Sequence, residues 1–326
     1  MLGGTVFLGR HLVAEALSDD HRVTIVHRGV HGAELFEGVE RVTADRSAPD
    51  GLARLAALVA GGRRWDAVVD TSGYVPRLVR ESAALLESAT STYCFISSIS
   101  VYADLAPIGV DETAPVTALD APDTEVVDGS SYGPLKAACE AYASLVIRPG
   151  LIVGPHDPSA RFAYWPHRMT RPGPVLAPGP PDQAVQVIDC RDLARLILRC
   201  LVDGREGTMN ATGVPVTFTD VVHAAALAAG SEPAIEWVDP EFLVQRGVAP
   251  WSGLPLWIPA SAGMAGFHRV DVSAALNAGM RTRPLVDTCR DTLAWIGAEP
   301  EAAFPSPSAL LTSDTEAALL AEWAAR

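Results

Sequence analysis

The stretch Ser130-Ser131-Tyr132-Gly133-Pro134-Leu135-Lys136 sets a phenol and an ammonium group four residues apart at the expected start of a helix. At that spacing both side chains leave the same helical face, so the ammonium can lie beside the phenol oxygen. A tyrosine hydroxyl has an unperturbed pKa of about 10, and a neighbouring cation lowers that pKa by favouring the phenolate. The pair therefore indicates general acid/base chemistry at a carbonyl or carbinol carbon, although an ordinary amphipathic helix can carry the same spacing.

A second polar cluster lies upstream of this helix. Residues 93–96 (YCFI) predict a short buried strand that runs directly into residues 97–102 (SSISVY). Open α/β sheets bind their ligands at the carboxyl ends of strands. We therefore expect the hydroxyl cluster, with Ser98 and Ser100, to lie near Tyr132 and Lys136.

Three motifs downstream of a glycine-rich N-terminus carry a family resemblance. The SSISVY strand end, YGPLK at 132–136 and RPGLIVGP at 148–155 resemble the extended short-chain dehydrogenase/reductase family, which includes nucleotide-sugar epimerases and dehydratases. The resemblance covers nearly the whole chain. It implies that Ser98 and Tyr132 hydrogen-bond the reacting oxygen, while Lys136 tunes the phenol and holds the nicotinamide ribose. Hydride would then pass between C4 of the nicotinamide and the substrate carbon.

The order of elements predicts an α/β fold, a Rossmann-like doubly wound parallel sheet with a smaller C-terminal α/β substrate lobe. We expect the nucleotide-binding domain to span residues 1–155 with a return at about 183–212. The substrate lobe would then comprise residues 156–182 and 213–326. Only Met1 and Leu2 precede the first glycine, so the normally central first strand is expected to be missing. The helix after Lys136 is expected to be short, since only residues 137–143 remain before the next strand.

Residues 1–13 (MLGGTVFLGRHLV) predict a glycine turn that opens a helix. Glycines let the backbone approach a pyrophosphate, whose charge the helix N-terminus stabilises. Val6 stands where the usual GxxGxxG pattern has its middle glycine, and the remaining GGxxxxG resembles an atypical subgroup of the family. A glycine cluster alone is more often a plain turn, but two strand–helix repeats follow this one. The residues expected to contact a cofactor here are Gly3, Gly4, Thr5, Phe7, Leu8 and Gly9.

The next strand, residues 23–26, ends at His27 and Arg28, where an NAD-selective site would have a carboxylate for the ribose hydroxyls. An arginine there offers a forked cation suited to a 2′-phosphate, so NADP is favoured over NAD. The alternative is that Arg28 is a solvated loop residue. By the resemblance, Asp45 contacts the adenine amine, although a simple loop aspartate fits the sequence nearly as well.

The resemblance also implies the remaining cofactor and substrate contacts. Thr71, Ser72 and Gly73 would pack around the ribose and pyrophosphate, and Pro149, Gly150 and Leu151 would hold the nicotinamide through their backbone. Many nucleotide-sugar members have an asparagine where Gly150 stands, which argues against a nucleotide-sugar substrate, and Leu78 replaces another frequent asparagine. Aromatic faces and cations after residue 160 suit an anionic or ring-bearing substrate, although an aromatic contact between two lobes is an equal alternative. The substrate candidates are Ser100, Arg161, Tyr164 and Trp165.

Composition limits the classes of partner. The 326 residues have a formal charge of -14 and no basic run, which argues against nucleic acid or an anionic membrane. Five scattered cysteines indicate buried free thiols, and His156 and His167 lack partners at metal-ligand spacing, so no metal is expected. Neither a signal peptide nor a membrane span is apparent, so a cytoplasmic protein is expected, with a homodimer as its candidate assembly.

These features together predict an NAD(P)-dependent oxidoreductase that transfers hydride reversibly at a secondary alcohol or ketone of a small molecule. A nucleotide-sugar epimerase or dehydratase uses the same triad and is the first alternative. A non-catalytic NADP-binding sensor, or an RNA-binding relative, is an alternative from another class. The acidic connection at residues 103–131 is expected to be a lid over the substrate pocket or a disordered surface insertion.

Overall fold

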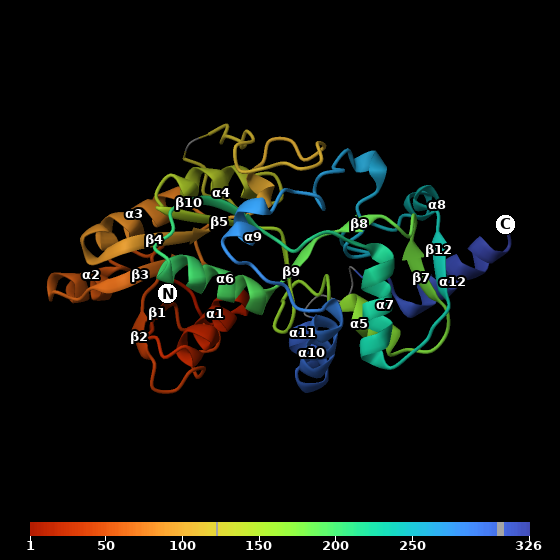
Figure 1. Ribbon diagram of the computed structural model, residues 1–326, viewed down its shortest axis with the longest axis horizontal. Helices are drawn as coiled ribbons and strands as arrows, with labels where there is room; N and C mark the ends of the chain where they lie inside the picture. The colour runs from red at the N-terminus through yellow and green to blue at the C-terminus, as the bar shows by residue number, and fades with distance from the viewer. Residues whose placement is uncertain (122, 305–309) are drawn as a thin grey trace.

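A parallel sheet forms the centre of the N-terminal lobe in the computed structural model, which describes residues 1–121, 123–304 and 310–326 (Figure 1). Strands β3 (Trp65–Asp70), β4 (Thr90–Ile96), β5 (Leu145–Pro149) and β10 (Gly207–Ala211) pair in the order β10-β5-β4-β3. Strands β1 (Thr24–His27) and β2 (Glu40–Thr43) form a parallel pair beside them. The doubly wound fold predicted from the sequence is therefore confirmed.

Leu2 joins these two groups of strands. It forms parallel bridges to Val26 on β1 and to Asp70 on β3. Its N–H donates to the carbonyl oxygen of Val69 (2.8 Å), and its own carbonyl accepts from Thr71 N–H (3.0 Å). As expected, the described residues before β1 form no strand; Met1 and Leu2 instead bridge β1 and β3 and satisfy backbone groups on both of them.

Helices cover both faces of this sheet (Figure 1). On one face lie α1 (Phe7–Ser18) and α6 (Cys190–Val202), and on the other lie α3 (Pro76–Leu86) and α4 (Tyr132–Glu140), with α2 (Ala53–Ala60) beside α3. The sequence forms α6 because Asp189 caps its first turn and apolar side chains recur at helical spacing on its buried side. These are Leu193, Leu196, Ile197 and Cys200, which join the core shared with α1.

The crossover after Lys136 is short, as predicted. Helix α4 has nine residues and ends at Glu140, three residues earlier than the sequence suggests. A tight turn then leads into β5, and Ser144 N–H donates to the carbonyl oxygen of Tyr93 (3.1 Å). A short 3-10 turn, η1 (Glu87–Ala89), precedes β4, and another, η2 (Ile99–Val101), follows it.

The C-terminal lobe is built around a separate apolar cluster. Strands β7 (Val175–Pro178) and β12 (Ile235–Val238) pair in parallel, against α5 (Tyr164–Met169), α7 (Phe218–Ala229), α8 (Pro240–Gln245), α10 (Leu285–Ala298) and α12 (Ser313–Ala324). Helix α7 begins with a capping box of Thr217 and Asp220 and ends at Gly230 in the left-handed conformation. The largest fully buried side chains here are Trp165, Trp257, Phe162, Phe218 and Phe242.

Two segments connect the lobes. In the first, β8 (Ala184–Val185) pairs antiparallel with β11 (Val216–Thr217), and β9 (Val187–Asp189) pairs in parallel with β6 (Leu151–Val153). After the 3-10 turn η3 (Ala260–Ala262), residues 264–280 return from the C-terminal lobe and add α9 (Ser273–Asn277) to the N-terminal core. The short helix α11 (Pro300–Ala303) follows α10.

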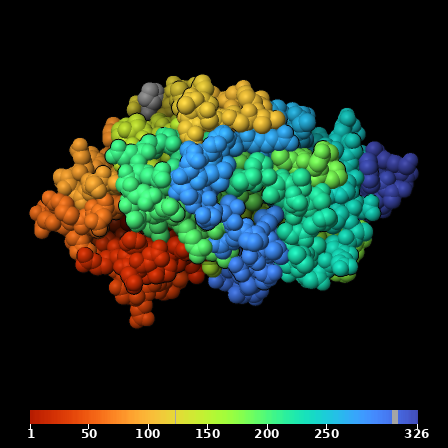
Figure 2. Space-filling model, viewed as in Figure 1, coloured from red at the N-terminus to blue at the C-terminus, as the bar shows by residue number. Residues whose placement is uncertain are grey.

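The acidic connection at 103–131 packs on this returning segment, with residue 122 outside the described residues. Gly109 N–H donates to Arg269, and Gly266 N–H donates to Leu105, both 2.8 Å to the carbonyl oxygen. In Figure 2 this loop, coloured orange to yellow, lies along the upper edge of the molecule. It is therefore a packed covering segment in its described part. No helix among the described residues is long and apolar enough to cross a membrane.

Candidate active site

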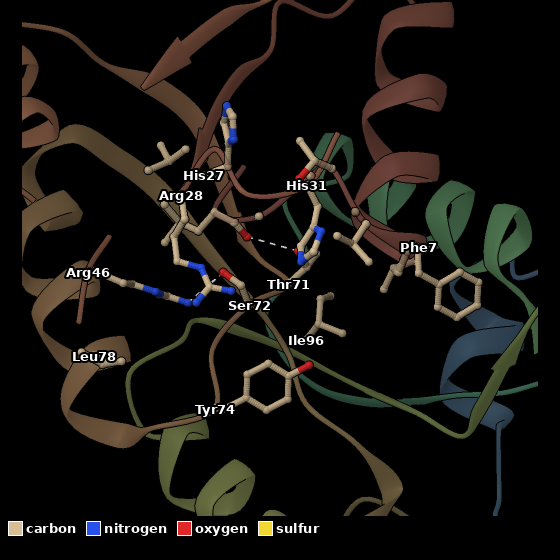
Figure 3. A pocket seen from close by; sticks show the side chains of 18 of the residues that line it. Phe7, His27, Arg28, His31, Arg46, Thr71, Ser72, Tyr74, Leu78 and Ile96 are labelled. Carbon is tan, nitrogen blue, oxygen red and sulfur yellow. Dashed lines mark hydrogen bonds between the residues drawn. The ribbon is translucent and has the colours of Figure 1, made fainter. Parts of the chain in front are cut away.

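One cavity of about 600 Å³ opens at the carboxyl ends of the central strands (Figure 3). Its wall is formed by the glycine turn before α1, the residues after β1, β2, β3 and β4, and the start of α4. This is the edge at which open α/β sheets bind ligands. The cavity brings together Ser98, Tyr132 and Lys136, which come from two elements more than thirty residues apart in sequence.

The glycine turn has the geometry of a phosphate cradle. Gly3 and Gly4 adopt φ values of +97° and +109°, which only glycine adopts readily. A Cβ atom on Gly9 would lie 2.7 Å from the backbone nitrogen of Gly4, so only glycine lets α1 approach the turn this closely. Within the described chain, α1 starts without a side-chain cap hydrogen bond at Val6 and without an acidic residue in its first turn. Its first N–H groups and its dipole are thus available to an anion, and the site fits a dinucleotide pyrophosphate.

Three predicted cofactor residues after β1 and β2, at one end of the cavity, differ in how they are hydrogen-bonded. His27 is buried, accepts a hydrogen bond at Nδ1 from Gly29 N–H (3.1 Å), and has its pKa lowered by burial and by Arg41. Asp45 accepts from the Ser47 N–H (3.0 Å) and hydroxyl (2.6 Å), and these bonds lower its pKa. Arg28 is exposed and has no hydrogen-bond or ion-pair partner among the described residues.

Arg46 is a cavity residue that the sequence analysis missed. Its guanidinium pairs in bidentate fashion with Asp70 (2.7 and 2.8 Å) and also donates to Ser72 (3.0 Å) and Ser82 (3.3 Å). Asp70 is fully buried and also accepts from the Tyr93 hydroxyl (3.0 Å). Burial alone would raise the pKa of Asp70, but Arg46 holds it below its usual value. Asp70 ends an apolar strand, and a buried carboxylate there needs a cation as its partner. This requirement was the sequence signal from which a buried arginine could have been expected.

Lys136 is held inside the protein rather than at the phenol oxygen. The Lys136 side chain is 3% exposed, and Nζ donates to the carbonyl oxygens of Gly73 (2.8 Å) and Ile96 (2.5 Å). Burial lowers the pKa of Lys136 to about 8, against an opposing effect of Asp70. Lys136 is also the only lysine in a sequence whose other basic residues are arginines, a signal that the sequence analysis did not use.

The pKa of Tyr132 is raised, which differs from the expectation. Burial is the main cause, and the nearby Tyr74 phenol adds to it. The opposing effects come from the Ser98 hydroxyl and from Arg161, and Lys136 is not among the described groups that shift this pKa. The structure therefore does not show the direct lowering of the phenol pKa by Lys136 that the helical spacing suggested. Ser98 itself accepts from Ser100 N–H and donates to the Ser100 hydroxyl, both at 3.1 Å.

Most of the other predicted cofactor residues line the cavity. Thr71 donates to the carbonyl oxygen of Leu2 (3.1 Å), and Thr71, Ser72, Pro149 and Gly150 all contribute to the wall. Gly73 and Leu151 lie outside the lining, and Gly73 acts instead as the acceptor for Lys136. A Cβ atom at position 150 would lie 2.7 Å from the hydroxyl oxygen of Thr212, so the threonine takes the space of a larger side chain there.

The predicted substrate residues fall into three different places. Arg161 lies over the ring of Trp251 (5.0 Å from guanidinium carbon to ring centroid) and acts electrostatically on Tyr132. Ser100 contacts Ser98 but does not line the cavity. Trp165 is fully buried and donates to the carbonyl oxygen of Pro255 (3.0 Å), so it belongs to the core of the C-terminal lobe.

Tyr164 packs edge-on against Trp165, with ring centroids 5.0 Å apart. It is buried, and its hydroxyl has no hydrogen-bond partner among the described residues. In the described part of the chain no three His, Cys, Asp or Glu side chains gather as a metal site would require. All five cysteines, at 94, 139, 190, 200 and 289, are free and buried.

Comparison with known proteins gives one family and one fold. The sequence model of the NAD dependent epimerase/dehydratase family matches residues 1–212. The sequence matches no curated protein at a significant level. The fold is similar to that of a UDP-galactose 4-epimerase, with a TM-score of 0.62 and 17% identity, covering 91% of this chain and 97% of the other.

Two further solved structures share the fold. One is the UDP-Glc/GlcNAc 4-epimerase from Campylobacter jejuni, with a TM-score of 0.64 and 15% identity, covering 91% of this chain and 98% of the other. The second is the dTDP-glucose 4,6-dehydratase from Bacillus anthracis in complex with NAD, with a TM-score of 0.63 and 15% identity, covering 93% and 97%.

Proposed function

The chain belongs to the NAD dependent epimerase/dehydratase family and is an enzyme, and from this membership we propose that it is an NADP-dependent oxidoreductase. The reaction is reversible hydride transfer at a secondary alcohol or ketone of a small molecule. The observation that carries the proposal is the meeting of Ser98, Tyr132 and Lys136 at the wall of one dinucleotide-sized cavity. The C-terminal lobe, residues 156–182 and 213–326, is assigned to substrate binding.

The protein's own groups supply the proton chemistry. A bound nicotinamide coenzyme supplies or accepts the hydride. Tyr132, whose pKa is raised by burial, holds its proton at neutral pH and gives it to the carbonyl oxygen as the alcohol forms. The Ser98 hydroxyl orients the same oxygen, and Lys136, a nearly buried cation at the cavity wall, contributes positive charge to the cavity without a direct contact to the phenol.

The preference for NADP rests on Arg28. Neither residue 27 nor residue 28 has a carboxylate that would repel a 2′-phosphate. The Arg28 guanidinium has no partner among the described side chains. Figure 3 shows Arg28 and Arg46 extending toward Ser72. Because Asp70 already neutralises Arg46, Arg28 is the cation left for the phosphate. NAD is the alternative, since several proteins of this fold were solved with NAD.

A nucleotide-sugar epimerase or dehydratase is the second candidate and is supported about as well. The fold neighbours include a UDP-galactose 4-epimerase and a dTDP-glucose 4,6-dehydratase. The two candidates differ in cofactor balance, because epimerisation and dehydration return the hydride to the substrate. A reductase consumes NADPH in proportion to product, whereas an epimerase or dehydratase forms product from UDP-galactose or dTDP-glucose with no net change in the coenzyme.

The test compares wild type with Tyr132→Phe on a panel of ketones with NADPH and on the two sugar nucleotides with NAD. The proposal predicts NADPH-consuming turnover that falls at least a hundredfold in Tyr132→Phe, within the range for loss of a general acid, while NADPH still binds. Tyr142→Phe removes the hydroxyl of a partly buried tyrosine outside the cavity lining and should keep full activity. Binding of NADPH without any Tyr132-dependent turnover would instead indicate a sensor.

A further inference from the structure

The ammonium group of Lys136 lies in a cage of carbonyl oxygens and aromatic faces. Two carbonyls, of Gly73 and Ile96, accept its hydrogen bonds. Its Nζ atom lies 4.3 Å from the ring centroid of Phe95 and 5.0 Å from that of Tyr74. Both distances are within the range at which a cation is attracted to the face of an aromatic ring.

The carboxylates around Lys136 contribute little free negative charge. The fully buried carboxylate of Asp70 acts on it, but Asp70 is already paired in bidentate fashion with Arg46. On its own helix Lys136 faces Cys139 and Glu140, and the Glu140 carboxylate is paired with Arg148. The two carbonyls and the two rings therefore add to the effect of Asp70 in keeping Lys136 charged.

The two rings are not equivalent. Phe95 is fully buried on β4 and belongs to the core, so its removal would leave a cavity. Tyr74 comes from the loop after β3, is 45% exposed and lines the cavity. Its ring also lies 6.2 Å from the ring of Tyr132, so it borders both members of the acid/base pair.

We propose that Tyr74 is a positioning residue that keeps the Lys136 ammonium charged and in place through the face of its ring. This inference rests on the proposed acid/base role of Lys136, but the effect it predicts can be measured on the protein without substrate or coenzyme. The ring face, and not the Tyr74 hydroxyl, makes the contact, because the cation is attracted to the π system. Tyr74→Phe should therefore preserve the stabilisation of the Lys136 ammonium, and Tyr74→Leu should lose it.

The single lysine makes this measurable without substrate or coenzyme. Protein labelled with ¹³C at the lysine ε carbon should give one resonance, whose pH titration reports the pKa of Lys136 directly. Wild type should titrate near pH 8. Tyr74→Leu should titrate roughly 0.4 to 1.5 units lower, the loss expected for one cation–π contact, and Tyr74→Phe should match wild type.

Two results would overturn the proposal: a Tyr74→Leu midpoint equal to wild type, or an equal shift in Tyr74→Phe. Tyr142→Leu serves as the matched control, because Tyr142 is a partly buried tyrosine that packs on apolar residues. Circular dichroism checks that each variant is folded, and Tyr74→Met replaces Tyr74→Leu should the latter fail to fold. Failure of the hydride-transfer proposal would leave these titrations unchanged, so the two ideas are tested separately.

Discussion

Arg28 and Arg46 lie at the same end of the cavity, but only one is free to bind a ligand. Arg46 makes four hydrogen bonds to Asp70, Ser72 and Ser82 and acts as part of the wall. Arg28 was identifiable from sequence because it follows a strand at the position where the family resemblance implies a contact to the ribose. Arg46 was not, because its partner Asp70 is 24 residues away and only the fold brings them together.

Arg28→Gln should weaken NADPH binding by roughly 10- to 100-fold, the loss of one charge-assisted hydrogen-bond set to a phosphate. Binding of NADH, which lacks the 2′-phosphate, should change little. Isothermal titration calorimetry with both coenzymes measures the ratio of their dissociation constants. Arg22→Gln, at an exposed arginine outside the cavity lining, is the control. Equal losses for NADPH and NADH would show that Arg28 does not read the phosphate.

At the scale of elements, a buried ion pair ties the helix with the acid/base pair to the neighbouring strand. Arg148 on β5 donates to Glu140 on α4 through Nε (2.9 Å) and Nη2 (2.7 Å), and the Ser97 hydroxyl donates to the same carboxylate (2.6 Å). Both charged side chains are nearly buried, at 6% and 11% exposure. The pair fixes α4 beside the end of β4, next to Ser98.

Glu140→Gln should lower the free energy of unfolding by about 3 kcal/mol or more, because it leaves the Arg148 charge buried without a counter-ion. Urea unfolding measures the change. Asp287→Asn is the matched control, since it breaks the exposed Arg290–Asp287 pair on α10 and should cost under about 1 kcal/mol. Similar effects of the two substitutions would contradict a specific role for the buried pair.

Element boundaries were predictable where local signals existed and not elsewhere. The buried runs on β3, β4 and β5 and the glycine turn identified the sheet. The bridges made by Leu2 were not predictable, because its backbone bonds go to β1 and β3, which are distant in sequence. Strands β8 and β9 are separated at Gln186, whose backbone and side chain bond to the returning segment. Local pattern cannot reveal such long-range bonds.

The whole molecule depends on that returning segment, which links the C-terminal lobe to the N-terminal core. Gln186 N–H donates to Nδ1 of His268 (3.1 Å), and the His268 Nε2–H donates to the carbonyl oxygen of Leu256 (3.0 Å). Gln186 also exchanges two hydrogen bonds with the backbone of Val270, at 3.0 and 3.1 Å. Burial lowers the pKa of His268 to about 4, so the ring is neutral in the folded protein.

This histidine predicts a pH-dependent stability. Its folded pKa lies below the unfolded value of about 6.5, so the unfolded chain takes up a proton first as the pH falls. Stability should therefore decrease from pH 6.5 toward pH 4, by an amount on the order of 3 kcal/mol for this group. His156, whose pKa is also lowered to about 4, acts in the same direction.

Urea unfolding between pH 7 and pH 5 checks the prediction, with His268→Gln as the comparison. The variant should be less stable at pH 7, because it loses the packing of the imidazole ring. Its free energy of unfolding should also decrease less between pH 7 and pH 5 than that of wild type. An unchanged slope in the variant would show that another group controls the acid sensitivity. No local pattern indicated this histidine, because its burial arises only when the two lobes meet.

The central claim, that a coenzyme cavity includes Lys136, is tested most directly by titrating NADPH into protein labelled at its single lysine. We predict that the one lysine resonance shifts saturably with the same midpoint as NADPH binding measured by nicotinamide fluorescence. Absence of NADPH binding, or saturation by NADPH with the lysine resonance unmoved, would contradict the account.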